Sequence, residues 1–338
     1  MTNEHWQTGI ELELMSPVGS SRRHLAHALA EEYSGRVVEF FHPEAEHSIS
    51  THNPVFQNLT LGFRVIDSDG LPVADLVDDL TLQQDLNKKK PPIPDWYRIV
   101  SNDARLLSLV QAQCDASDRG KALLLPIARI YGTEPVNKEG MIRISDKAGS
   151  PIAMLAPLPG ERERPCEVVL APIKCNLTDK LTVILTQANA LGFTLASEAA
   201  THFHFDASRL LSGRVIARLI RFFHHFSSQL RIRFNTNPLN RRLGAMPKTL
   251  VELSSNEQFI DADWNVAHQM LKNCEQSKFQ EINFLNIAKE NLEKHTLEVR
   301  MIGPSMDVEW LVTQFFYVEK VLEWAIGNET MPLKANEL

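Results

Sequence analysis

Cysteine is scarce in this sequence, and long apolar runs are absent from it. The four cysteines are scattered and form no C-x-x-C pair, so they indicate neither a zinc site nor a disulfide framework and favour a reducing compartment. No apolar stretch approaches the ~20 residues needed to span a bilayer, and the first residues lack the basic and apolar segments of a secretory signal. We therefore expect a cytoplasmic protein without a membrane partner.

An excess of positive charge is also missing. The formal net charge is −7 and the pI is near 6.0, which argues against general binding of nucleic acid through its phosphates. With 43% hydrophobic and 23% charged residues, the 338-residue chain has the composition of an ordinary globular protein. No internal repeat, low-complexity tract or domain boundary stands out.

Several well-known site motifs are absent as well. The sequence has no G-x-x-x-x-G-K-[ST] loop, no G-x-G-x-x-G after a strand, no G-x-S-x-G elbow and no H-E-x-x-H helix. If a nucleotide is used, it is not bound through a Walker loop.

The pattern of elements predicts an α+β fold with an antiparallel or mixed sheet, because strands and long helices do not alternate strictly. Prolines after a run of lysines predict a loop over 88–96, and the charged segment 160–165 reads as a lid or, more commonly, a solvated turn. Helices are expected at about 19–35, 102–114, 178–191, 208–230, 261–273 and 307–326. Strands are expected at about 8–14, 36–41, 63–66, 73–77, 122–132, 141–145, 151–157, 166–173, 201–207 and 296–302.

The stretch TGIELEL, residues 8–14, places two carboxylates on one strand face. Glu11 and Glu13 are two apart between apolar residues, and residues i and i+2 of a strand point the same way. Neighbouring carboxylates repel unless a cation lies between them or water covers them. For this motif alone, a wet polar sheet face is the better interpretation.

The same alternation recurs on other apolar strands. THFHFD places His202 and His204 on one face, and LEVRM places Glu298 and Arg300 on one face. CEVVLAPI has Glu167 near the start of an otherwise apolar strand. Singly, H-x-H is more often structural and E-x-R is more often an ion pair. Together they favour a metal and phosphate site, since carboxylates and imidazole suit Mg²⁺ or Mn²⁺ and a guanidinium matches phosphate oxygens.

These four motifs, in this order over residues 9 to about 320, resemble the carboxylate–amine ligases of the glutamine-synthetase-like superfamily, and most closely their amidoligase branch. The resemblance implies a curved antiparallel or mixed sheet with flanking helices, forming a trough for ATP and two divalent metals. It implies one catalytic domain over 1–338, with an inserted strand-rich segment around 115–165. Branch members typically carry an Asp-x-Ser before the Glu167 strand, where this sequence offers only Asp103.

The resemblance also implies roles for individual residues. Glu298 and Arg300 would be catalytic, with Arg300 contacting the transferred phosphoryl group. Arg241 or Arg242, in NTNPLNRRLG, would contact substrate or phosphate, although a basic solvated turn explains them equally well. The metal ligands, with His202 and His204 as alternatives, would be Glu11, Glu13, Glu167, His202, His204 and Glu298.

The expected reaction is ATP-dependent formation of an amide or peptide bond through an acyl phosphate, with Mg²⁺ or Mn²⁺. Its substrate would be a small molecule or peptide: an amino acid, a peptide or a polyamine. Two alternatives stay open. One is a guanidino kinase-like phosphotransferase, and the other is a non-catalytic ATP- and metal-binding protein on the same scaffold. The sequence predicts no oligomeric state.

Overall fold

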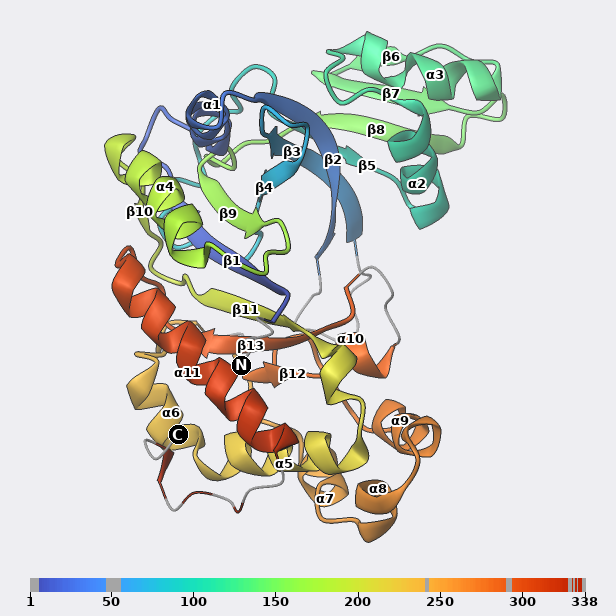
Figure 1. Ribbon diagram of the computed structural model, residues 1–338. Coiled ribbons are helices and arrows are strands. Elements are labelled where there is room, and N and C mark those ends of the chain that lie inside the picture. The colour runs from blue at the N-terminus through green and yellow to red at the C-terminus, as the bar shows by residue number, and fades with distance from the viewer. Residues whose placement is uncertain are drawn as a thin grey trace. The chain divides into compact units, whose positions relative to one another are not determined.

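The computed structural model describes residues 6–46, 56–240, 243–289 and 294–327, together with 330, 332, 334 and 335. Helices flank a large sheet of antiparallel strands, which confirms the expected α+β class (Figure 1). The glutamine-synthetase-like form of this fold and the single domain over 1–338 stay predictions. The chain divides into two compact units. Unit 1 comprises the described parts of Met1–Glu13, Leu170–Leu185 and Ser197–Leu338, and unit 2 those of Leu14–Val169 and Thr186–Ala196.

The sheet of unit 1 has one apolar and one polar face. Its strands lie in the order β12, β13, β11, β1 with antiparallel neighbours. On β11, Phe203 and Phe205 are fully buried, and their rings lie 5.6 and 5.1 Å from that of Phe315 on the long helix α11, which crosses this sheet (Figure 1). The alternating His202 and His204 are therefore turned to the face away from α11. The bounds are β1 (Thr8–Met15, shared with unit 2 from Leu14), β11 (Thr201–Asp206), β12 (Ile282–Asn283), β13 (Thr296–Ile302) and α11 (Val308–Ile326).

The long helix expected over 208–230 is interrupted. It consists of a 3₁₀ turn and the helices α5 and α6, because the chain leaves helical geometry at Ser212, the N-cap of α5. At Gly213 an added Cβ would lie 1.9 Å from the carbonyl oxygen of Phe259, so the absence of a side chain lets α5 begin against α8. The helix expected over 261–273 begins later, at Trp264. The bounds are α5 (Gly213–His225), α6 (Ser227–Arg233), α7 (Lys248–Leu253), α8 (Glu257–Asp261), α9 (Trp264–Lys272) and α10 (Leu285–Ala288).

The sheet of unit 2 is organised around one long strand, β3. The strand β2 pairs with β3 along its whole length, whereas β4 and β5 share the opposite edge, at its C-terminal and N-terminal ends respectively. The order continues from β5 through β8 and β7 to β6, and β9 follows β4. The bounds are β2 (Arg36–Glu46), β3 (Phe56–Ile66), β4 (Pro72–Val77), β5 (Tyr97–Val100), β6 (Val136–Lys138), β7 (Met141–Ser145), β8 (Pro151–Pro157), β9 (Pro165–Leu170) and β10 (Thr194–Leu195).

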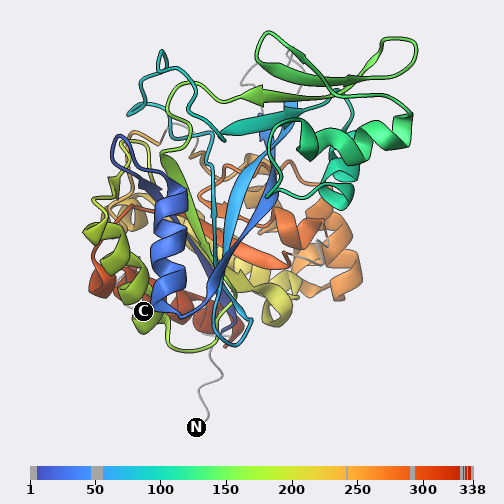
Figure 2. The same cartoon turned by 90° about the horizontal axis from the view of Figure 1, so that it is seen from above.

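Helices cover the apolar face of this sheet. The helix α1 packs on β3, and α2 and α3 pack on β8 and β7 (Figure 2). Asp103, the candidate for the Asp-x-Ser motif, is the N-cap of α2 and accepts a hydrogen bond from the backbone N–H of Arg105. Among the described residues, no helix has both the length and the apolar character needed to cross a membrane. The bounds are α1 (Arg22–Glu32), α2 (Ala104–Gln113), α3 (Lys121–Tyr131) and α4 (Leu177–Ala190, shared with unit 1).

The strand expected over 122–132 is wrong, because this segment is the helix α3. The apolar run and Pro126 suggested a strand, yet the buried side chains of Leu123, Leu124, Ile127 and Ala128 follow the spacing of a helix. Gly132 ends the helix in the left-handed conformation. The segment around 115–165 therefore contains a helix as well as strands.

The charged segment 160–165 is a buried turn, and its interpretation as a solvated turn is wrong. Arg162 pairs with the buried Asp78, and Arg164 lies 2.8 Å from Glu161. The guanidinium of Arg22, which is fully buried, donates to the carbonyl oxygens of Arg162 and Pro165 at 2.7 and 3.2 Å. Because paired charges and satisfied carbonyls tolerate burial, the turn packs inside unit 2.

Candidate active site

The polar face of the unit 1 sheet gathers charged side chains from separate strands. The register places Glu11 on β1 opposite His202 on β11, and His204 opposite Glu298 on β13. Opposite residues of antiparallel strands share a face, so alternation along each strand and pairing between strands bring these groups together. The register therefore brings the paired residues of TGIELEL, THFHFD and LEVRM to one face of the sheet, which their spacing in the sequence could not establish.

Glu11 is at the centre of this group. Its Oε2 lies 2.8 Å from Nδ1 of His202, and its Oε1 lies 3.1 Å from Nε2 of His204. The same two imidazole nitrogens lie 3.8 and 3.9 Å from Oε1 of Glu298. One ligand atom from each of Glu11, His204 and Glu298 can be chosen so that all lie within 4.8 Å of one another. We call these three residues the acidic cluster.

Glu13 extends the cluster along β1. Its Oε1 lies 3.4 Å from Nε2 of His202, and its Oε2 accepts a 2.7 Å hydrogen bond from the backbone N–H of Ala200. His202 therefore lies between Glu11 and Glu13, and the backbone N–H fixes the Glu13 carboxylate. Glu13, His202 and Glu298 are all buried, which keeps bulk water from screening their charges.

Glu298 is held from two sides. One of its oxygens pairs with Nη1 of Arg300, and Oε2 accepts a 2.7 Å hydrogen bond from Nδ2 of Asn283 on β12. The register sets Asn283 opposite Glu298, and both side chains are buried. Sequence reasoning missed Asn283, whose only signal is one amide in the apolar stretch INF. It also missed Thr296, whose Oγ1 lies 3.3 Å from Nδ1 of His204.

The electrostatics of the cluster keep its carboxyls ionised. Burial alone would raise the pKa of Glu11, but the charge of His204, the hydrogen bond with His202 and the charge of His202 hold that pKa well below its usual value. Burial likewise opposes ionisation of Glu298, but the charges of Arg300, His204 and His202 together outweigh it and lower the pKa. For His204, burial lowers the pKa, but the charge of Glu11, its contact with the imidazole and the charge of Glu298 together outweigh burial, so the net pKa is raised. Ionised carboxylates at these distances can bind a cation.

The donor set fits a divalent metal ion. Two carboxylates and an imidazole in the acidic cluster are ligand types that Mn²⁺ and Mg²⁺ accept. The buried Nε2 atoms of His202 and His204 have no partner in hydrogen-bond geometry among the described residues. Such atoms are costly to bury unless something else satisfies them. Glu11, His204 and Glu298 are therefore the residues best placed to hold a metal, with Glu13 and His202 beside them.

The geometry of unit 1 does not test the remaining predicted site residues. Glu167 is on β9, half-buried and within unit 2, and its role as a ligand stays a prediction. Arg241 and Arg242 lie outside the described residues, so their predicted contact with substrate or phosphate also stays a prediction.

Comparison with known proteins gives one match. No curated protein and no solved structure matches the chain. Residues 4–319 match a protein family described as "putative amidoligase enzyme", a span that includes all the motifs of the predicted site. The chain therefore belongs to this amidoligase family.

Proposed function

We propose that this protein is an ATP-dependent carboxylate–amine ligase that works through an acyl phosphate. The observation that supports this most strongly is the acidic cluster beside Arg300, because it combines a metal-type donor set with a phosphate-type donor. The membership of the amidoligase family points to the same reaction class. The substrate would be an amino acid, a peptide or a polyamine.

In the first step, an oxygen of the substrate carboxylate attacks the γ-phosphorus of ATP, the bond to the bridging oxygen breaks, and ADP leaves. Mg²⁺ or Mn²⁺ held by Glu11, His204 and Glu298 would supply positive charge for the phosphate oxygens. Arg300 would donate to the transferring phosphoryl group. Its Nε is buried without a hydrogen-bond partner among the described residues, while Nη1 faces Glu298.

In the second step, the amine nitrogen attacks the activated carbonyl, the C–O bond to phosphate breaks, and phosphate and a proton are released. The residues of this chain would serve mainly to orient and to neutralise charge. Asn283 and Arg300 hold the Glu298 carboxylate in one position, and Glu11 is held by both imidazoles. Fixed donors of this kind stabilise charge without reorganising during the reaction.

The test is release of ADP and phosphate from ATP with Mg²⁺ or Mn²⁺, across pools of amino acids, peptides and polyamines. Release of both products that requires a carboxylate and an amine together is the expected result. Glu298→Gln should reduce turnover by about a thousandfold or more. The substitution removes the negative charge that would hold the metal ion and that pairs with Arg300 during phosphoryl transfer. Glu252→Gln, at an exposed glutamate on α7, is the matched control.

Two outcomes would contradict the proposal. ADP release without phosphate would indicate a phosphotransferase. Nucleotide and metal binding without any product in every pool, measured by calorimetry, would favour a non-catalytic binding protein.

A further inference from the structure

The sheet of unit 2 has a polar face of its own, opposite the one that its helices cover. On β5, Tyr97 and Ile99 are buried toward the helices, and the Tyr97 hydroxyl reaches the carbonyl oxygen of Ala116, between α2 and α3. Arg98 and Val100 alternate with them and are turned to the other face. This second face belongs to unit 2 alone.

Two rows of side chains cross this face from strand to strand. In the first row the register aligns Arg143, Met154, Val100, Asn58 and Glu44, on β7, β8, β5, β3 and β2. In the neighbouring row, Arg98 is aligned with Ala156 on β8 and Thr60 on β3. The face therefore changes from basic at β7, through apolar, to amide and carboxyl groups at β3 and β2.

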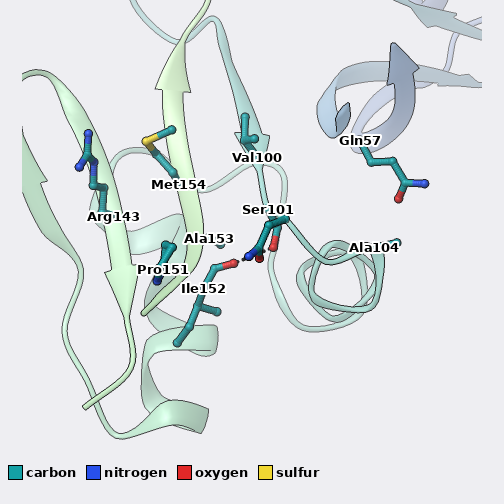
Figure 3. A pocket seen from close by; sticks show the side chains of 10 residues that line it. Gln57, Val100, Ser101, Ala104, Arg143, Pro151, Ile152, Ala153 and Met154 are labelled. Atoms are coloured by element: carbon teal, nitrogen blue, oxygen red, sulfur yellow. Dashed lines mark hydrogen bonds between the residues drawn. The ribbon is translucent and has the colours of Figure 1, made fainter. Parts of the chain in front are cut away.

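A cavity of about 630 Å³ lies over the β7 end of the first row. Arg143, Met154 and Val100 line it side by side, and Ile152 and Ser101 close one end, joined by a 2.8 Å hydrogen bond between the Ser101 hydroxyl and the Ile152 carbonyl oxygen (Figure 3). A volume of this size suits a small molecule or the end of a peptide.

Three polar side chains on this face, of which Arg143 lines the cavity, have buried atoms without partners. The Nε atoms of Arg98 and Arg143 are buried and have no hydrogen-bond partner among the described residues. The Oδ1 atom of Asn58, which is 3% exposed, is also buried without a partner there. Buried donors and acceptors in a folded protein are normally satisfied, so these groups are available to a ligand.

We propose that this cavity binds the C-terminal carboxylate of a short peptide whose last residue is aliphatic. The planar fork of Arg143 matches a carboxylate through two parallel hydrogen bonds. Met154 and Val100 give the adjacent floor an apolar character that suits an aliphatic side chain and not the hydration shell of a phosphate. Asn58 follows Val100 in the same row, beyond the residues that line the cavity, and its Oδ1 atom would accept a hydrogen bond from an N–H group where the peptide extends along the row.

The spacing favours a peptide over a free amino acid. Each step along the row is one strand spacing, so the backbones at Arg143 and Asn58 are about 14 Å apart. A ligand that reaches from Arg143 toward Asn58 therefore has to cover part of this distance along the row. An extended chain covers about 3.3 Å per residue, so a carboxylate and an N–H group of a dipeptide span this gap better than those of one amino acid.

The test is calorimetric titration of the full chain, without nucleotide or metal, so that it does not depend on the proposed ligase chemistry. The probes are Ala-Leu, free leucine, Ala-leucinamide and inorganic phosphate. Ala-Leu should bind more tightly than leucine, and Ala-leucinamide, which has no carboxylate, should bind at least about tenfold more weakly than Ala-Leu. Arg143→Met should weaken Ala-Leu binding by about tenfold or more, whereas Arg129→Met, at an exposed arginine on α3, should leave it unchanged.

Arg143→Lys keeps the charge without the fork and should give an intermediate loss, which preserves the test if the methionine variant does not fold. Equal binding of Ala-Leu and Ala-leucinamide would overturn the proposal, as would unchanged binding in Arg143→Met. Binding of phosphate in preference to Ala-Leu would show a general anion site instead. Tighter binding of leucine than of Ala-Leu would refute the peptide, and no binding of any probe up to about 10 mM would refute the site.

Discussion

Glu44 should make the stability of unit 2 fall as the pH rises through neutrality. The carboxyl is buried on β2, where the hydroxyl of Thr60 donates to it at 3.3 Å. Burial, with a further contribution from the charge of Asp78, raises its pKa from 4.5 to about 9. The folded state therefore holds this proton more tightly than the unfolded chain does.

The sign and size follow from that difference. A raised folded-state pKa contributes stability that is fully present below about pH 4.5 and is lost as the pH rises through about 9. At about pH 6 the contribution is roughly 4 kcal/mol, and at about pH 8 it is roughly 1.4 kcal/mol. The free energy of unfolding should therefore fall by about 2–3 kcal/mol over this interval.

The measurement is urea unfolding followed by circular dichroism at several pH values between about 6 and 8. Glu44→Gln, which cannot ionise, should lose this part of the slope, while Glu31→Gln, at an exposed position on α1, should retain it. If Glu44→Gln kept the full pH dependence of the wild type, another group would be responsible and the reasoning would be refuted.

Other substitutions test the site and the packing. Asn283→Ala should weaken Mn²⁺ binding by about 10–100-fold in calorimetry, because it releases the carboxylate of Glu298, and unchanged affinity would exclude this role. Arg22→Met should lower the free energy of unfolding by about 3 kcal/mol, since it removes a buried partner of Asp78; a neutral effect in urea would contradict this. Gly213→Ala should cost about 1–3 kcal/mol in the same assay, because the new methyl group meets a backbone carbonyl, and a stabilised variant would be unexpected.

Much of the site could be predicted because strand alternation is local. Two-residue spacing assigns Glu11 with Glu13 and His202 with His204 to common faces without any tertiary information. Their convergence depends on register between strands that are 191 residues apart in the case of Glu11 and His202. Asn283 could not be predicted from the sequence in this way, because its importance comes only from lying opposite Glu298.

The errors in the predicted fold also come from contacts between residues far apart in the sequence. Over 122–132, a short apolar run with a proline fits a strand or a buried helix equally well. The segment is a helix because Leu123 and Ile127, four residues apart, are buried on the same face. The break at Ser212 depends on a carbonyl of α8 that approaches Gly213 from more than forty residues away. The burial of the turn 160–165 depends on Arg22 and Asp78, which nothing near the turn reveals.

The buried turn 160–165 also affects how the native protein meets proteases. Trypsin needs an accessible arginine or lysine in a chain that can enter its active site. In GERERP only the bond after Arg162 qualifies, because Arg164 is followed by Pro165. Here the side chain of Arg162 is 12% exposed and that of Arg164 is 10% exposed. Cleavage after Arg162 therefore requires local opening of unit 2, whereas the exposed lysines at 88–90 lie in a loop. The most charged stretch of the sequence thus becomes one of its protected segments.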